Sequence, residues 1–171
     1  MAAETGRRHF RVLDVASGGG DVAIDLQRRA AAAGIELDIV GCDISETAIQ
    51  HAQASVAKAA SNVRFEKRNV LTDPPAEQFD IVTCSLFLHH LRADDAVALL
   101  ENLSQVTGQL LLVNDLVRSR WGKLLADVAC RVLSRSSVVH VDGPRSVEGA
   151  FTLEEAVGLC RAALLDGALV G

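Results

Sequence analysis

Tyrosine is absent from the sequence, tryptophan occurs once, and aromatic residues make up only 4% of the 171 positions. No apolar run reaches the roughly 18 residues of a transmembrane helix, so we expect no integral membrane segment. The first residues, MAAETGRRHF, lack the apolar core of a signal peptide, which favours a cytoplasmic protein. Basic residues number 17 against 22 acidic ones, and this net charge of −5 argues against a dedicated nucleic-acid binder.

The four cysteines are widely spaced and form no CxxC pair. Cys42 and Cys84 lie inside apolar runs, so we expect buried free thiols rather than disulfides or zinc ligands. Such thiols fit a reducing cytoplasm. The histidines show no spacing typical of metal ligands, and we therefore expect no metal site.

The chain is 49% apolar, and its length fits a single domain, residues 1–171, with a substantial core. Hydrophobic periodicity predicts strands at 10–15, 37–42, 63–65, 79–85 and 110–113, and residues 168–171 could begin a sixth. It predicts a helix from 22 to about 34, one capped by Ser45, one over 93–105 stopped by Gly108, and an amphipathic one over 119–133. The last helix opens with Thr152 and Glu155, the spacing of a capping box.

This alternation of strands and helices predicts an α/β fold with a parallel sheet and right-handed crossovers. Ligands bind such sheets at the carboxyl ends of the strands. The turns that follow those ends are residues 18–20, Asp43, Asn69, residues 85–90 and residues 114–115. The polar and glycine-rich turns of the chain should therefore share one edge of the sheet.

A strand, a glycine turn and a helix follow one another in FRVLDVASGGGDV, residues 10–22. Glycines let the backbone approach a ligand closely, and the free N–H groups of the helix start can face its polar atoms. Asp43 follows Gly20 by 23 positions, where a carboxylate can accept hydrogen bonds from both hydroxyls of a ribose. Asp43 could instead cap the next helix beside Ser45, and Asn69 could either bind an adenine amino group or serve as a loop residue.

Four blocks in this order carry a resemblance to a known family: VLDVASGGGDVA, GCDIS, RNV and FDIVTCSLFLHHL. Together they resemble class I S-adenosylmethionine-dependent methyltransferases, and the first block is similar to the ubiquinone/menaquinone-biosynthesis type and related small-molecule enzymes. The resemblance implies a Rossmann-like, doubly wound sheet in the order 3-2-1-4-5, with the usual sixth and seventh strands incomplete or absent.

The resemblance also implies a cofactor, S-adenosyl-L-methionine, and its product, S-adenosyl-L-homocysteine. The implied cofactor contacts are Asp14, Ala16, Gly18 and Gly20 for the methionine part, Asp43 for the ribose, Asn69 and Val70 for the adenine, Ser85 to close the site, and Ser17 and Ile44 beside them. Two positions depart from the family pattern. Ala16 stands where many members have the first glycine, and Asn69 replaces a common aspartate, so its adenine bond would be neutral rather than charge-assisted.

The implied reaction is methyl transfer to a small-molecule acceptor that is aromatic, quinone-like or polyketide-like. His90, and second to it His89, follow the fourth strand and could act as a general base. Residues 118–150 occupy the place of a cap after the fifth strand. The candidate substrate rim comprises Asn114, Asp115, Trp121, His140 and Asp142.

Two alternatives to a small-molecule methyltransferase stay open. Gly18, Gly20 and Ala23 satisfy the dinucleotide fingerprint, so an NAD(P)-dependent oxidoreductase is one; without tyrosine, the Tyr–Lys pair of short-chain dehydrogenases is excluded. The other is a truncated, non-catalytic or partner-dependent methyltransferase-like domain. The short ends would then leave a sheet edge for a second copy or another partner to cover.

Overall fold

A computed structural model describes residues 6–118, 149–165 and 167–171. The chain forms two compact units, one of residues 1–85 with 102–113 and the other of residues 86–101 with 114–171. The first unit carries the sheet and its glycine turn. The second carries the two adjacent histidines and the last helix.

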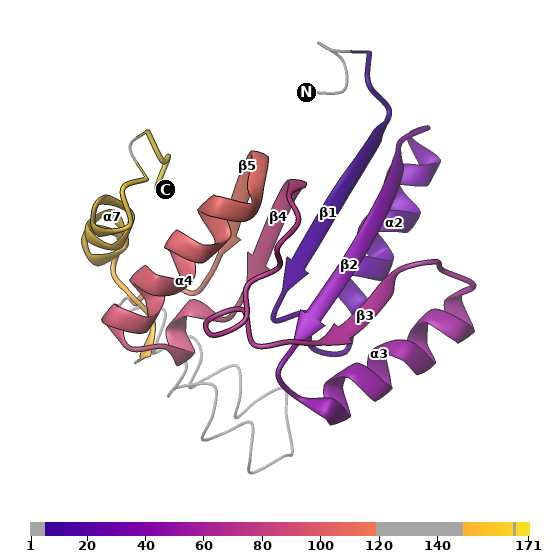
Figure 1. Cartoon of the computed structure of the whole chain (residues 1–171), viewed down its shortest axis with the longest axis horizontal. Coiled ribbons are helices and arrows are strands. Elements are labelled where there is room, and N and C mark those ends of the chain that lie inside the picture. Colours follow the sequence, from indigo (N-terminus) through magenta and orange to yellow (C-terminus); the bar gives the residue numbers. More distant parts are fainter. Residues whose placement is uncertain (1–5, 119–148, 166) are drawn as a thin grey trace, which may run out of the picture. The chain divides into compact units, whose positions relative to one another are not determined.

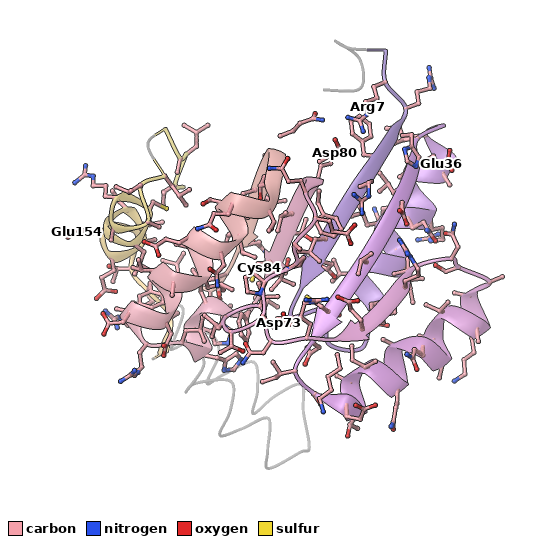
Figure 2. The ribbon with its side chains drawn as sticks, in the orientation of Figure 1. Arg7, Glu36, Asp73, Asp80, Cys84 and Glu154 are labelled. Atoms are coloured by element: carbon pink, nitrogen blue, oxygen red, sulfur yellow. The ribbon has the colours of Figure 1, made fainter. Side chains whose placement is uncertain are left out.

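The sheet is parallel, and its strand order is β3-β2-β1-β4-β5, as predicted. The strands are β1 (His9–Val15), β2 (Glu36–Asp43), β3 (Arg64–Lys67), β4 (Phe79–Ser85) and β5 (Thr107–Asn114). In the pairing of β1 with β4, Asp14 lies opposite Thr83 and Val15 opposite Cys84. On the other side of β1, Val15 lies opposite Cys42. Two buried thiols therefore flank the end of the central strand, and Figure 2 labels one of them, Cys84.

Two helices accompany the β1-β2-β3 half of the sheet (Figure 1). They are α2 (Asp21–Ala32) and α3 (Glu46–Ala59), and both pack against β2. Ser45 caps α3 as predicted, because its Oγ accepts a hydrogen bond from the Ala48 N–H at 3.2 Å. The core of this half contains Phe10, Val12, Ala23, Leu37, Ile39, Ile49, Ala52, Val63 and Phe65, all buried.

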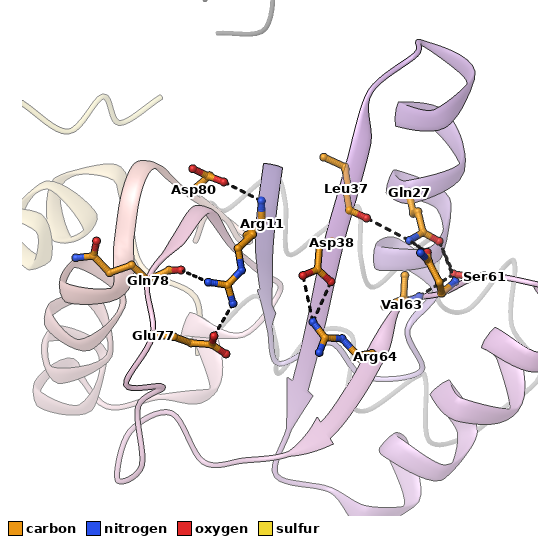
Figure 3. Close-up of polar contacts among 11 residues, drawn as sticks. Arg11, Gln27, Leu37, Asp38, Ser61, Val63, Arg64, Glu77, Gln78 and Asp80 are labelled. Carbon is orange, nitrogen blue, oxygen red and sulfur yellow. Dashed lines mark hydrogen bonds and ion pairs between the residues drawn. The ribbon is translucent and has the colours of Figure 1, made fainter. Parts of the chain in front are cut away.

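Charged side chains join the amino-terminal ends of the strands (Figure 3). Asp80 accepts hydrogen bonds from both terminal nitrogens of Arg7 at 2.7 Å, from the Arg11 N–H at 2.8 Å and from Gln109 at 2.9 Å. Burial raises the pKa of Asp80, but these donors outweigh burial and lower it overall. On the neighbouring strands, Arg64 pairs with Asp38 at 2.9 Å. These contacts lie at the opposite end of the strands from the glycine turn.

Helix α4 (Ala93–Val106) runs directly into β5, so the expectation that Gly108 stops it is wrong. The Thr107 hydroxyl donates to the Leu103 carbonyl at 2.6 Å and completes the last turn before the glycine. Gly108 lies inside β5, where a Cβ would come within 3.2 Å of the Phe79 carbonyl oxygen. Its small size therefore permits a close approach to the start of β4.

The second unit contains a short 3-10 turn, η1 (Leu88–His90), and helix α7 (Leu153–Ala162). The predicted capping box is present at α7, since Thr152 Oγ1 accepts from the Glu155 N–H and Glu155 accepts from the Thr152 N–H. Arg118 forms an ion pair with Glu155 at 2.5 Å. Residues 168–171, which could have begun a sixth strand, are not in a strand: Gly167 turns with a φ of +93° and Leu169 is fully exposed. Of the described helices, none is long and apolar enough to span a membrane.

Candidate functional site

The glycine turn begins where β1 ends, and three of its residues have a left-handed backbone. The φ angles are 55° at Ala16, 52° at Gly18 and 81° at Gly20. The Ser17 N–H donates to the Cys42 carbonyl at 3.0 Å, and the Gly20 N–H donates to the Ser17 carbonyl at 2.9 Å. The first bond holds the turn against β2, and the second closes the turn on itself. The left-handed φ at Ala16 accounts for the glycine that the family pattern has at this position, because glycine adopts that conformation at lower cost than alanine.

Asp43, at the carboxyl end of β2, binds the glycine turn directly. Its Oδ2 accepts a hydrogen bond from the Gly18 N–H at 3.0 Å, and its Oδ1 accepts one from the Ser45 N–H at 2.8 Å. The carboxylate therefore contributes to the start of α3 and also reaches the predicted ligand loop. Each of its oxygens keeps a further lone pair for another donor.

Phe65 fills the space beneath the glycine turn. A Cβ placed on Gly20 would lie 2.5 Å from the Phe65 ring and 3.0 Å from Ala52, and a Cβ on Gly41 would also collide with that ring. Both glycines are therefore required by packing under the turn. Gly18 is not restricted by packing in this way, because a Cβ placed on it would meet nothing within 4 Å.

Ser17 carries the one buried side-chain oxygen or nitrogen without a hydrogen-bond partner in the described part of the chain. Its Oγ would lie 3.0 Å from a Cβ on Gly41. A buried hydroxyl without a partner costs free energy, so such an atom calls for an explanation. A polar ligand group at the turn would provide one.

Asp14 is a buried carboxyl group, 3% exposed, in the central strand. The Thr83 hydroxyl donates to its Oδ1 at 2.8 Å. Burial raises the pKa of Asp14, and the hydrogen bond from Thr83 partly opposes that rise. Sequence reasoning missed Thr83, because its role depends on the register of β4 against β1.

Asn69 forms a local turn after β3. Its Oδ1 accepts from the Leu71 N–H at 3.1 Å, and its carbonyl accepts from the Asp73 N–H at 2.7 Å. Val70 follows as a buried residue whose carbonyl accepts from Asn102 at 2.9 Å. Asn69 therefore stabilises the loop through its own hydrogen bonds, which is one of the two roles considered for it.

Two further predicted positions flank this edge of the sheet. Ser85 is the last residue of β4 and is partly buried. Ile44 follows Asp43 and is 60% exposed, which is unusual for an isoleucine so close to a core strand. The exposed Ile44 side chain could pack against the face of a flat ligand.

In the second unit, Asp115 binds His89. Its Oδ1 lies 2.6 Å from His89 Nδ1, and its carboxylate accepts from the backbone N–H groups of His89 at 3.2 Å and Leu116 at 2.6 Å. The His89 side chain is only 5% exposed. His90 is exposed, and its ring lies 4.0 Å from the His89 ring, centroid to centroid. Asp115, which was predicted at the substrate rim, therefore holds the His89 ring in place by a hydrogen bond.

Asn114 ends β5, and its carbonyl accepts from the Leu86 N–H at 2.8 Å. Trp121, His140 and Asp142 lie outside the described residues, as does nearly all of the expected cap at 118–150. Within the described ranges, no group of three or more His, Cys, Asp or Glu side chains is arranged to hold a metal ion.

The parallel sheet and its glycine turn define an open α/β protein of the nucleotide-binding kind. A family model described as a methyltransferase domain matches residues 12–109, more than half of the chain. The chain belongs to this methyltransferase-domain family.

Among curated proteins, the chain is 40% identical to a demethylmenaquinone methyltransferase of Deinococcus radiodurans over 76 residues, which are 44% of this chain and 30% of the relative. It is 32% identical to a ubiquinone biosynthesis O-methyltransferase of Hahella chejuensis over 83 residues, 47% of this chain and 32% of the relative. The match thus spans about a third of the length of these relatives.

Solved structures share the fold. The plantazolicin methyltransferase BamL, in complex with a triazolic desmethylPZN analog and SAH, has a TM-score of 0.75 at 19% identity, over 97% of this chain and 58% of that one. The YcgJ protein from Bacillus subtilis has a TM-score of 0.62 at 22% identity, over 92% of this chain and 62% of that one.

Proposed function

We propose that the chain binds S-adenosylmethionine and transfers its methyl group to a small aromatic or quinone-like acceptor. The observation that carries this proposal is the Asp43 carboxylate, bound to Gly18 N–H at the carboxyl edge of the sheet in a chain of the methyltransferase-domain family. The names of the curated relatives, both linked to quinones, support the acceptor class.

The residues of the turn fit such a cofactor. Asp43 has lone pairs left for ribose hydroxyls, Ser17 offers a buried hydroxyl without a partner, and the space beside Gly18 is open. Asn69 and Val70 are the proposed adenine contacts, and the exposed Ile44 would lie along the nucleoside. When bound, S-adenosylmethionine supplies an electrophilic sulfonium methyl group for in-line displacement by the acceptor.

His90 is the proposed general base. His89 is already engaged by Asp115, whereas His90 is exposed and leaves a ring nitrogen available to accept the proton of an acceptor hydroxyl. Substitution His90→Gln should lower the rate of methyl transfer about a hundredfold without lowering the melting temperature. A rate unaffected by this change would remove His90 from the mechanism.

The cofactor proposal is tested by calorimetric titration with S-adenosylmethionine, S-adenosylhomocysteine and NAD. We expect micromolar binding of both adenosyl ligands, weakened about a hundredfold in Asp43→Ala because two hydrogen bonds to a charged group are lost. Asp38→Ala is the matched control, since Asp38 is a carboxylate at the other end of β2 that pairs with Arg64. Binding of NAD alone would establish the oxidoreductase alternative instead.

A partner-dependent domain is the second candidate, and β5 favours it. Leu110 and Leu112 on this edge strand are 41% and 53% exposed, which is the kind of edge that another chain can cover. Light scattering of the purified chain distinguishes a monomer from a homo-oligomer. We also propose a cytoplasmic location, supported by the burial of the Cys42 and Cys84 thiols inside the sheet.

A further inference from the structure

Helix α7 has two lines of apolar side chains, and only one of them is buried. The buried line includes Leu159 and Ala163, which are 7% and 4% exposed. The second line, called here the α7 stripe, consists of Leu153, Val157, Cys160 and Leu164. Its spacings of four, three and four residues place these side chains on one narrow face of a helix. The leucines at its two ends are 47% and 81% exposed, so the stripe is an apolar face in contact with water.

Leu164, with a φ of 55°, is the residue at which the chain turns out of α7. The Leu164 N–H donates to the Arg161 carbonyl at 3.1 Å and the Leu165 N–H to the Cys160 carbonyl at 2.9 Å, the two bonds that commonly end a helix at a left-handed residue. Glycine is usual at that position, because a Cβ makes the conformation costly. The helix ending therefore explains the φ of Leu164, but it does not explain an exposed leucine there. A contact with another molecule would explain it.

Charged side chains of opposite sign lie on one flank of the α7 stripe. Glu154 is in the first turn of α7, where Figure 2 labels it, and Arg161 is in the last turn. They are seven residues apart, close to two helical turns, so both project from the same side of the stripe. Both are exposed, and neither forms an ion pair with another described residue. The neighbouring Glu155, in contrast, is already engaged by Arg118 and by the helix cap.

This charge pattern is complementary to itself. If two copies of α7 pack stripe to stripe and run in opposite directions, a twofold axis relates them and the same flank of each helix meets. Glu154 of one copy then lies beside Arg161 of the other, and the pair occurs twice. In a parallel arrangement this flank would instead face Ala156 and Ala163, which carry no charge. Antiparallel packing also places the opposite ends of the two helix dipoles side by side.

We propose that α7 is a self-association surface, through which two copies of this chain pack antiparallel along the α7 stripe. Association would remove the exposed leucine surface from water and would give Leu164 a contact that glycine cannot make. Each copy contributes one helix of ten residues. This is small for a protein interface, so we expect a weak dimer with a dissociation constant of about 0.1 mM. The inference does not depend on the cofactor proposal.

Sedimentation equilibrium of the full chain from about 10 µM to 1 mM tests the inference, with a reductant present so that no disulfide through Cys160 contributes. Glu154→Arg and Arg161→Glu should each weaken the dimer about tenfold or more, because each places like charges across the axis. An equimolar mixture of the two variants should regain the affinity of the parent, since one copy then carries two arginines and the other two glutamates. Glu36→Arg is the control: Glu36 is an exposed glutamate in β2, also labelled in Figure 2, and its substitution should leave the dissociation constant unchanged.

Leu164→Gly separates the contact from the fold. At about 5 µM, where the chain is monomeric, this variant should melt no lower than the parent, because glycine adopts the left-handed conformation at lower cost. Its dimer should nevertheless be about tenfold weaker, because the apolar contact is lost. A parent chain that stays monomeric at all concentrations overturns the inference, and so does a mixture of the charge variants that associates no better than either alone. Dimers unaffected by both charge variants overturn it as well, and would be formed by another surface such as the edge of β5.

Discussion

The Asp43 carboxylate accepts a hydrogen bond from the Gly18 N–H at 3.0 Å and so ties the end of β2 to the turn that follows β1. The same carboxylate accepts from the Ser45 N–H at 2.8 Å, at the start of α3. The group proposed to hold a ribose thus also shapes the loop beside it. Loss of Asp43 should therefore act on the turn as well as on the ligand.

The first prediction concerns hydrogen exchange of the glycine turn. In Asp43→Ala, protection of the Gly18 amide should fall about tenfold or more, because its acceptor is removed. The Ser17 amide is the internal control, since it donates to the Cys42 carbonyl and does not depend on Asp43. Amide exchange followed by NMR without ligand checks this. Unchanged protection of Gly18 would contradict the bond to Asp43.

The second prediction concerns Asp14 and pH. Because the pKa of Asp14 is raised in the folded chain, its contribution to stability is fully present below the unfolded value of 3.8 and is lost as pH rises through the folded value. The Thr83 hydroxyl limits that loss by hydrogen bonding to the carboxylate. Thr83→Val should therefore raise the pKa of Asp14 further and destabilise the chain more at pH 8 than at pH 3.5, by about 1.5–3 kcal/mol at the higher pH.

Urea unfolding at both pH values measures this effect. Thr107→Val is the matched control, because Thr107 also donates its hydroxyl, but to the uncharged Leu103 carbonyl. Its cost should be about 1 kcal/mol and the same at both pH values. A pH-independent cost for Thr83→Val would show that Asp14 does not titrate against this hydroxyl.

The third prediction separates the two adjacent histidines. Asp115 accepts three hydrogen bonds, two of them from backbone N–H groups, so Asp115→Ala should lower the free energy of unfolding by about 2–4 kcal/mol. His89→Ala should also destabilise, because the ring is buried against that carboxylate. His90→Ala, at an exposed position, should stay within about 0.5 kcal/mol of the parent chain. Equal losses for His89→Ala and His90→Ala would contradict this division of roles.

The elements that sequence reasoning predicted well are those with local signals. Strand β4 occupies the predicted residues 79–85, and Ser45 and Thr152 cap their helices as expected. Each of these depends on residues a few positions apart. The glycine turn and Asp43 could also be placed, because the ends of parallel strands meet at one edge.

Contacts that depend on register or on distant segments could not be predicted. Thr83 meets Asp14 only because β4 pairs with β1 in one register, and His89 and Asp115 lie 26 positions apart. Gly108 was wrongly expected to stop a helix, because a threonine hydroxyl had already completed its last turn. The residues assigned to the acceptor rim at 121, 140 and 142 lie outside the described chain and remain predictions.

The last prediction concerns the packing beneath the glycine turn. A Cβ on Gly41 would overlap the Phe65 ring and approach Ser17 Oγ at 3.0 Å, so Gly41→Ala should destabilise the chain by about 1–3 kcal/mol. Gly158→Ala is the control, because Gly158 lies in helix α7 with nothing within 4 Å of the added atom, and it should stabilise by about 0.5–1 kcal/mol.

Phe65→Leu tests whether the ring causes the clash. Alone it should destabilise through lost packing, but combined with Gly41→Ala it should cost less than the sum of the two changes, since the smaller side chain makes room for the new methyl group. Urea unfolding of the four chains gives the interaction free energy between the two sites. If the losses in the free energy of unfolding are additive, the Phe65 ring is not what the new methyl group meets.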